Sequence, residues 1–161
     1  MSSFDIVSKA DLQEVDNAIN QTSKEILSRY DFKGSKSEIK REENIVKILA
    51  DDDFKLEAVI DIFKGRLIKR GLSIKYLDFK KKEDASKGMV RQEVEIKEGI
   101  DKEPSKLIIQ EIKKISPKTT IENLKDHLRV SSKSKDELQK IISDLKNFEI
   151  NIELSFVNFR E

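Results

Sequence analysis

Two stretches of the chain decide its fold: residues 37–63, which read SEIKREENIVKILADDDFKLEAVIDIF, and residues 119–145, which read TTIENLKDHLRVSSKSKDELQKIISDL. Each stretch begins with two short segments typical of an antiparallel hairpin and continues with apolar residues at helical spacing. The apolar positions match at a constant offset of 82, which pairs Ile48, Leu56, Val59, Ile60 and Phe63 with Val130, Leu138, Ile141, Ile142 and Leu145. The chain therefore contains an internal duplication of one pattern.

The order of elements also repeats outward from these two stretches. We expect helices that begin near Asp11, Asp51, Asp101 and Lys135, and the first helix carries apolar residues at helical spacing as far as Tyr30. Strands are expected at residues 4–7, 37–41, 44–50, 72–79, 90–96, 119–124, 127–131 and 150–159, with a lysine-rich loop at 80–88.

Strand, helix, two strands, helix, strand is the order of ferredoxin-like modules, in which both helices cover one face of an antiparallel sheet. We therefore predict an α+β protein of two tandem ferredoxin-like (RNP-like) modules, each a four-stranded antiparallel sheet with two helices on one face. The other face of each sheet would remain open to a ligand or a partner.

The strand at 90–96 can be placed in two ways. It could start the second module, which gives a contiguous split near residue 86, or it could form a hairpin with residues 72–79. We favour the hairpin, because sequential antiparallel strands usually pair. Residues 4–7 then complete the second sheet, so the first module comprises residues 10–100 and the second comprises residues 1–9 and 101–161.

Charge and cysteine content exclude several kinds of site. Lys and Arg number 32 against 31 Asp and Glu, so binding of nucleic acid would require cations gathered on one surface. The absence of cysteine excludes disulfides, thiolate metal sites and cysteine nucleophiles. The first residues lack the pattern of a signal peptide, and no apolar run reaches the roughly 18 residues of a membrane span. We expect a cytoplasmic protein that makes no membrane contact.

Residues 51–53, three consecutive aspartates, are the obvious candidate for a Mg²⁺ or Ca²⁺ site. Their counterparts at the offset of 82 read KSK, so a shared metal role is excluded and helix capping is favoured. His127 is the only histidine, is expected to face solvent, and has no second imidazole with which to hold a metal or relay a proton. No serine lies in a nucleophile motif. We therefore predict no enzyme activity, no cofactor and no metal.

Residues 29–36, which read RYDFKGSK, combine cations and aromatic residues beside a flexible glycine. Arg29, Lys33 and Lys36 could contact phosphate while Phe32 stacks on a base. The alternative is a helix end with Phe32 in the core, and the sequence leaves both interpretations open.

Three further residues carry suitable chemistry. The tail at 156–160, FVNFR, is similar to the end of an aromatic RNA-recognition motif and adds Phe159 and Arg160. Arg91 lies on the charged face of the alternating strand at 90–96.

Ordered stretches along nearly the whole chain resemble the YajQ family of bacterial proteins: residues 3–8, 11–21, 29–37, 48–56, 91–94, 99–103 and 156–160. The resemblance implies tandem ribonucleoprotein-type modules, nucleotide binding, cyclic di-GMP binding and regulatory roles in some members, and no enzyme activity. The chain departs from the family at residues 125–133, where KDHLRVSSK replaces a glycine-aspartate turn and a threonine-glycine end. The specificity of the second module is affected by that departure.

The leading hypothesis is a non-enzymatic nucleotide-binding or nucleic-acid-binding protein whose ligand is GTP, cyclic di-GMP or RNA. Phosphates would be held by Arg29, Lys33, Lys36, Arg91 and Arg160, and bases would stack on Phe32 or Phe159. The alternative hypothesis is an adaptor that binds a protein partner through an open sheet face or edge.

Overall fold

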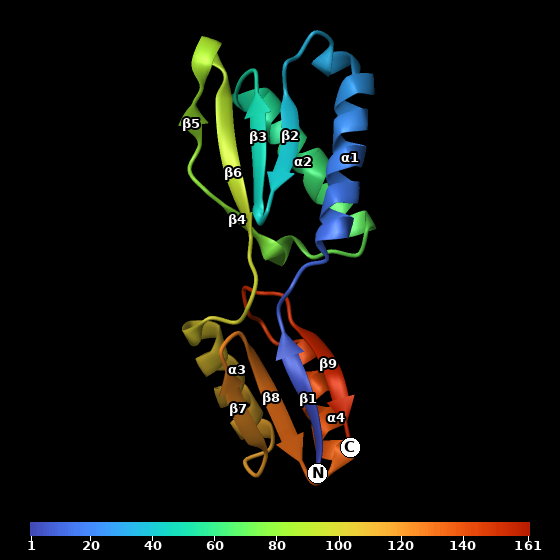
Figure 1. The fold of residues 1–161 in the computed structure, drawn as a ribbon, viewed down its shortest axis with the longest axis vertical. Coiled ribbons are helices and arrows are strands. Elements are labelled where there is room, and N and C mark those ends of the chain that lie inside the picture. Colours follow the sequence, from blue (N-terminus) through green and yellow to red (C-terminus); the bar gives the residue numbers. More distant parts are fainter. The chain divides into compact units, whose positions relative to one another are not determined.

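The computed structural model describes residues 1–161, which form two compact units. Residues 10–97 form the central unit, named for its position in the sequence. Residues 1–9 and 98–161 form the terminal unit, which holds both chain ends (Figure 1). Each unit has its own cluster of buried apolar side chains and therefore its own hydrophobic core.

The central unit is an antiparallel sheet with two helices on one face (Figure 1). Its helices are α1 (Leu12–Ser28) and α2 (Asp53–Lys69), and its strands are β2 (Glu38–Glu42), β3 (Ile45–Ala50), β4 (Leu77–Phe79), β5 (Glu83–Asp84) and β6 (Val90–Ile96). Three short 3-10 turns are η1 (Tyr30–Phe32), η2 (Ile74–Tyr76) and η3 (Ser86–Gly88). The strand order is β2-β3-β6-β4, and β5 also pairs with β6.

Side-chain caps fix where the helices of the central unit begin. The Asp11 carboxylate accepts a hydrogen bond from the Gln13 N–H at 3.0 Å, and the Asp52 carboxylate accepts one from the Lys55 N–H at 2.8 Å. After α2, Gly71 adopts a φ of +82°, which a residue without a Cβ tolerates and which turns the chain out of the helix. The aspartates at 51–53 therefore open α2, as the capping interpretation predicts.

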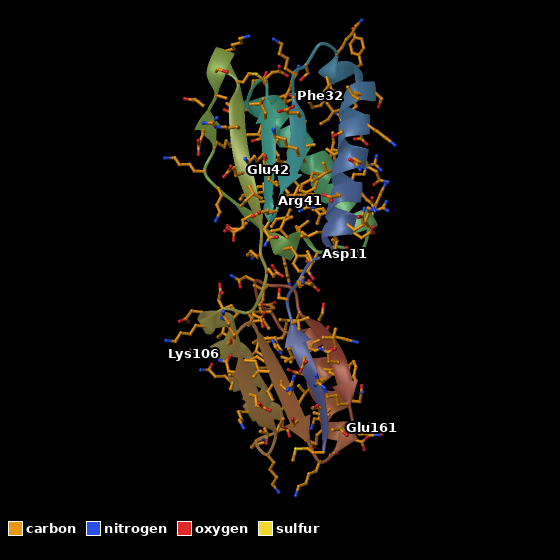
Figure 2. All side chains as sticks on the ribbon, viewed as in Figure 1. Asp11, Phe32, Arg41, Glu42, Lys106 and Glu161 are labelled. Atoms are coloured by element: carbon orange, nitrogen blue, oxygen red, sulfur yellow. The ribbon has the colours of Figure 1, made fainter.

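The core of the central unit lies between the helices and the sheet. Its fully buried large side chains are Val15, Val46, Ile48, Leu56, Phe63 and Leu67. Ion pairs join the elements around it: Arg41 of β2 donates two hydrogen bonds to Asp16 of α1, at 2.6 and 2.8 Å, and Arg66 of α2 pairs with Glu25 of α1. Figure 2 labels Arg41 towards one end of this unit and Phe32 at the other.

The terminal unit repeats this arrangement with strands from both ends of the chain. Its helices are α3 (Lys102–Ile115) and α4 (Lys135–Lys146), and its strands are β1 (Ser2–Val7), β7 (Thr120–Leu124), β8 (His127–Ser132) and β9 (Ser155–Arg160), in the order β7-β8-β1-β9. All pairs are antiparallel. Phe4, Ile6, Leu128 and Val130 are completely buried against the helices.

The mixed fold of two antiparallel sheets with helices is confirmed, and β4 pairs with β6 as the favoured hairpin requires. Three expected boundaries are wrong. The strand at 72–79 is shortened because the Ser73 hydroxyl accepts the Lys75 N–H at 3.1 Å and caps η2. The last strand begins only at Ser155. Helix α1 ends at Ser28, so Tyr30 does not continue its apolar face.

The duplication extends to hydrogen-bond register and caps. Glu38 pairs with Leu49 in the first hairpin, and the residues 82 positions later pair with each other in the second. The N-cap Asp52 corresponds to Ser134, which caps α4 by accepting the Glu137 N–H at 3.3 Å. Positions related by 82 are therefore structurally equivalent from the first hairpin into the following helix.

We predict that Asp52→Ala lowers the free energy of unfolding of the central unit by about 1 kcal/mol, because α2 loses its cap. Urea denaturation followed by circular dichroism measures this change. Asp52→Asn keeps the acceptor and should retain most of the stability. The matched control is Asp53→Ala, since the Asp53 carboxylate is 69% exposed and approaches only Lys82, at 3.9 Å. Equal losses in both alanine variants would contradict the capping role.

Candidate functional site

Several loops of the central unit meet at one end of its sheet. The start of β2, the end of β3 and the start of β6 lie side by side, because Glu38 pairs with Leu49 and Leu49 pairs with Arg91. Strand β5 joins them, since Glu83 pairs with Arg91. Residues 29–37 lead into β2, so this segment ends here. Helix α2 follows β3, so its first turn also lies here.

Asp51 fixes the segment that leads into β2. Its carboxylate accepts hydrogen bonds from the Lys36 N–H at 3.2 Å, from the Ser37 hydroxyl at 3.1 Å and from the Ser35 hydroxyl. Burial acts to raise the pKa of Asp51, but these donors favour the charged form and lower the pKa below its ordinary value. Asp51 thus serves as an internal anion that the loop closes around.

Phe32, one of the two aromatic residues expected to stack on a base, lies in the core. It is 4% exposed and belongs to the apolar cluster of the central unit. The Arg29 guanidinium lies 5.8 Å from the ring centroid and the Lys55 ammonium 5.9 Å from it. Between the two interpretations that the sequence left open, this geometry favours the core one, because the ring is not accessible to a base.

The cations of this segment differ in their availability. Arg29 donates two hydrogen bonds to Asp31, at 2.9 and 2.8 Å, and lies 3.8 Å from Glu25. The Asp31 carboxylate raises the pKa of Arg29, and Arg29 in turn lowers the pKa of Asp31. Lys33 and Lys36 are exposed and form no ion pair. Only these two lysines offer their charge to a ligand without first leaving a carboxylate.

Two exposed aromatic residues in or near this segment are missing from the predicted site residues, although Tyr30 lies within the predicted segment 29–36. Tyr30 is 88% exposed in η1, and Phe54 is 77% exposed in the first turn of α2. Phe54 could have been found, because it precedes Leu56 by two positions and so lies off the apolar face of its helix. Tyr30 was misassigned to the helix, although η1 begins directly after the cap of α1.

The lysine-rich loop contributes further cations to the same end of the sheet. Lys82 lies 3.9 Å from Asp53, which places the loop beside the first turn of α2. Lys81 and Lys87 are exposed and unpaired. We define the cationic end of the central unit as its unpaired lysines together with the two exposed aromatics: Tyr30, Lys33, Lys36, Phe54, Lys81 and Lys87.

Arg91 also lies at this end, on the open face of the sheet, but its guanidinium is 3.4 Å from Glu83. Two further cations of the open face are likewise paired, Lys47 with Glu42 at 2.9 Å and Lys80 with Asp78 at 2.7 Å. A phosphate on the open face would therefore compete with carboxylates. The cationic end presents no such competition at its lysines.

The remaining site candidates, Phe159 and Arg160, belong to the terminal unit. Phe159 is 61% exposed and its ring centroid lies 5.9 Å from that of the buried Phe4. Arg160 hydrogen-bonds to Asp5 at 3.4 and 3.5 Å. These two candidates therefore belong to a different unit from the other five.

Asp5 is the centre of a polar cluster on the open side of the terminal sheet. Its side chain is 2% exposed and accepts hydrogen bonds from Arg129 at 2.9 Å and Asn158 at 2.9 Å, besides those from Arg160. Burial acts to raise the pKa of Asp5, but the three donors outweigh burial and lower the pKa from 3.8 to about 2. The cluster links β1, β8 and β9 and holds Arg160 by two long hydrogen bonds.

Other possible sites are not supported. His127 is half-buried, its Nδ1 lies 2.7 Å from an Asp126 carboxylate oxygen, and no group of three potential metal-ligating side chains occurs. None of the helices is long and apolar enough to span a membrane.

We predict that Asp5 contributes to the stability of the terminal unit at neutral pH and loses this contribution in acid. Its folded pKa of about 2 lies below the ordinary 3.8, so on the order of 2 kcal/mol is present above about pH 4 and is lost as the pH falls towards 2. Asp5→Asn should therefore be destabilised at pH 7, and its deficit relative to the parent should shrink by pH 3 in urea titrations.

The control for this prediction is Glu149→Gln, which changes an exposed carboxylate with no ion pair and should alter the unfolding free energy little. A deficit of Asp5→Asn that stays constant between pH 7 and pH 3 would contradict the role assigned to the carboxylate.

Comparison with known proteins agrees with this architecture. A family model described as nucleotide-binding protein YajQ-like matches residues 2–160. A nucleotide-binding protein from Geotalea uraniireducens is 55% identical over 161 residues, which is 100% of both chains. Nucleotide-binding proteins from Trichlorobacter lovleyi and Magnetococcus marinus are 53% and 49% identical over the same 161 residues, again covering 100% of both chains. The chain therefore belongs to the YajQ family.

Proposed function

We propose that this protein is a non-enzymatic binder of nucleotides or nucleic acid and that it holds its ligand at the cationic end of the central unit. The observation that carries the proposal is the combination of exposed Tyr30 and Phe54 with the unpaired Lys33 and Lys36 on a loop fixed by Asp51. The names of its relatives, nucleotide-binding proteins, support the same class of ligand.

The chemistry of this surface suits a phosphorylated base. A phosphate can accept hydrogen bonds from Lys33 and Lys36 without breaking an ion pair, so little of the binding energy is lost to rearrangement. Tyr30 and Phe54 present accessible rings on which a base can stack. Because Asp51 holds the Lys36 backbone, the loop needs little ordering when a ligand arrives.

The proposed ligands are GTP, cyclic di-GMP or a short single-stranded RNA, and the proposed role is regulatory and cytoplasmic. RNA would extend beyond the loop towards Arg91, which lies at the same end of the sheet and would have to leave Glu83. Salt distinguishes these ligands, since an RNA polyanion releases condensed counterions on binding and a single nucleotide releases few. Arg29 would not contact the ligand directly, because its guanidinium group is hydrogen-bonded to Asp31.

A second candidate function is that of a protein-interaction adaptor. Strand β2 lies at one edge of the central sheet and β7 at one edge of the terminal sheet, and an edge strand offers unpaired backbone groups to an incoming strand. The paired charges of the open face of the central unit also suit a mixed-charge protein surface better than a polyanion.

We predict that Lys33→Gln combined with Lys36→Gln weakens binding of GTP, cyclic di-GMP or RNA by about tenfold or more, because charge-assisted hydrogen bonds are lost. Isothermal titration calorimetry at two salt concentrations measures the affinity and its salt dependence. The matched control is Lys69→Gln, an exposed lysine in the last turn of α2, about 20 Å along the helix from Phe54. If the double variant binds all three ligands as tightly as the parent does, the cationic end is not the binding site. That result would favour the adaptor function.

We also predict that two phenylalanine substitutions separate packing from stacking. Phe54→Leu should weaken binding by about 1–3 kcal/mol and leave the melting curve unchanged, since the ring is exposed. Phe32→Leu should lower the melting temperature, because a buried ring is replaced by a side chain of different shape, while affinity measured well below the melting temperature changes little. Calorimetry and thermal denaturation of both variants test this pair. The reverse pattern would make Phe32 the stacking residue.

A further inference from the structure

The terminal unit contains a pocket at the position equivalent to the Asp51 loop of the central unit. Its volume is about 570 Å³, and its lining includes Lys118, Thr120, Ser132, Lys133 and Ser134. The pocket lies where the connection after α3 enters β7 and where β8 ends before α4. This is the end of the terminal sheet that corresponds to the cationic end of the central unit.

The offset of 82 relates the two places by sequence position, although the hydroxyl donors differ. Pro117 stands at the position of Ser35, and Thr119, whose hydroxyl donates to Ser116 at 2.8 Å, stands at the position of Ser37. Lys118 is equivalent to Lys36, and Lys133 is equivalent to Asp51, because the hairpins share one register and the helices share one cap position. In the central unit the Asp51 carboxylate fills this place and accepts hydrogen bonds from the Lys36 N–H and two serine hydroxyls. The fold therefore has a position where one repeat binds an anion that it supplies itself.

The terminal unit supplies no anion at that position. Lys133 stands where the carboxylate would be, and both Lys133 and Lys118 are exposed and form no ion pair. The Ser132 and Ser134 hydroxyls accept hydrogen bonds from the Ser134 and Glu137 N–H groups, which leaves their own hydrogens free to donate. Two lysines and two serines with free hydroxyl hydrogens thus line a pocket of sufficient size for a phosphate group.

Glu137 is the one acidic side chain in the lining. It is equivalent to Lys55, which lies 4.0 Å from Asp51, so the two repeats carry this pair with opposite signs. Among the side chains of the lining, Lys118 and Lys133 against Glu137 leave an excess of one positive charge, and the Glu137 carboxylate acts against an incoming anion. Its removal should therefore strengthen binding.

We propose that this pocket is a second anion site, which takes a phosphate group from solution at the place that Asp51 fills in the central unit. The phosphate could be free, as in inorganic phosphate or a mononucleotide, or part of an RNA backbone. The site is separate from the cationic end and does not depend on the function proposed for it.

The test uses the full chain labelled with ¹⁵N and titrated with inorganic phosphate, with guanosine monophosphate and with a short RNA. Phosphate should shift the amide resonances of residues 118 and 132–134. Lys133→Asp places at position 133 the negative charge that Asp51 carries in the central unit, and Lys118→Gln removes one ammonium group. Each substitution should weaken phosphate binding by about tenfold or more. Glu137→Gln should bind more tightly than the parent. The matched control is Lys140→Asp, an exposed lysine of α4 outside the pocket lining.

The amide spectra show directly whether each variant is folded. Shifts with phosphate and the mononucleotide identify a site for free phosphates, whereas shifts with RNA alone identify a backbone contact, and both support the proposal. No shifts at these residues with any of the three probes, or equal binding by Lys133→Asp and Lys140→Asp, would overturn it. If the function proposed for the cationic end is wrong, the amide resonances of residues 29–37 should not shift. The outcomes for the two sites are therefore distinguishable.

Discussion

The pairing of β1 between β8 and β9 is the interaction on which the division of the chain depends. It places Phe4 and Ile6 at the centre of the terminal core and Asp5 in a polar cluster on the opposite side of the sheet. Because the first strand of the chain belongs with the last ones, residues 10–97 form an insertion that must be a complete unit by itself. The hairpin between β4 and β6 closes that unit.

The sequence predicted most of the fold because its signals are local: periodicity, caps and a duplicated hairpin each occupy neighbouring positions. The functional surface was less accessible to prediction. The burial of Phe32 depends on contacts beyond its own segment, and the exposure of Tyr30 depends on where α1 stops. The Asp5 cluster joins residues more than 120 positions apart, so no pattern along the chain announces it. Charge content likewise did not reveal which lysines are unpaired.

The duplication has kept the backbone and changed the chemistry placed on it. Both hairpins share a register, and both following helices begin with a capping side chain. At the equivalent loop, however, Asp51 and Lys55 in one repeat stand where Lys133 and Glu137 stand in the other. One repeat satisfies its own donors with a carboxylate, which makes its loop rigid. The other has lysines and serines in the lining of a pocket instead, so similar backbones can offer different surfaces to ligands.

The position of β1 also has a consequence for the synthesis of the protein. Val7, the last residue of β1, is synthesised almost 150 residues before β9 begins at Ser155, which at about 5–20 residues per second is an interval of roughly seven to thirty seconds. During that time the central unit can fold, whereas Phe4, Ile6 and Val7 of β1 still lack their neighbouring strand β9. Until β9 has been synthesised, the nascent chain therefore carries an apolar strand that chaperones can bind and that can associate with other chains.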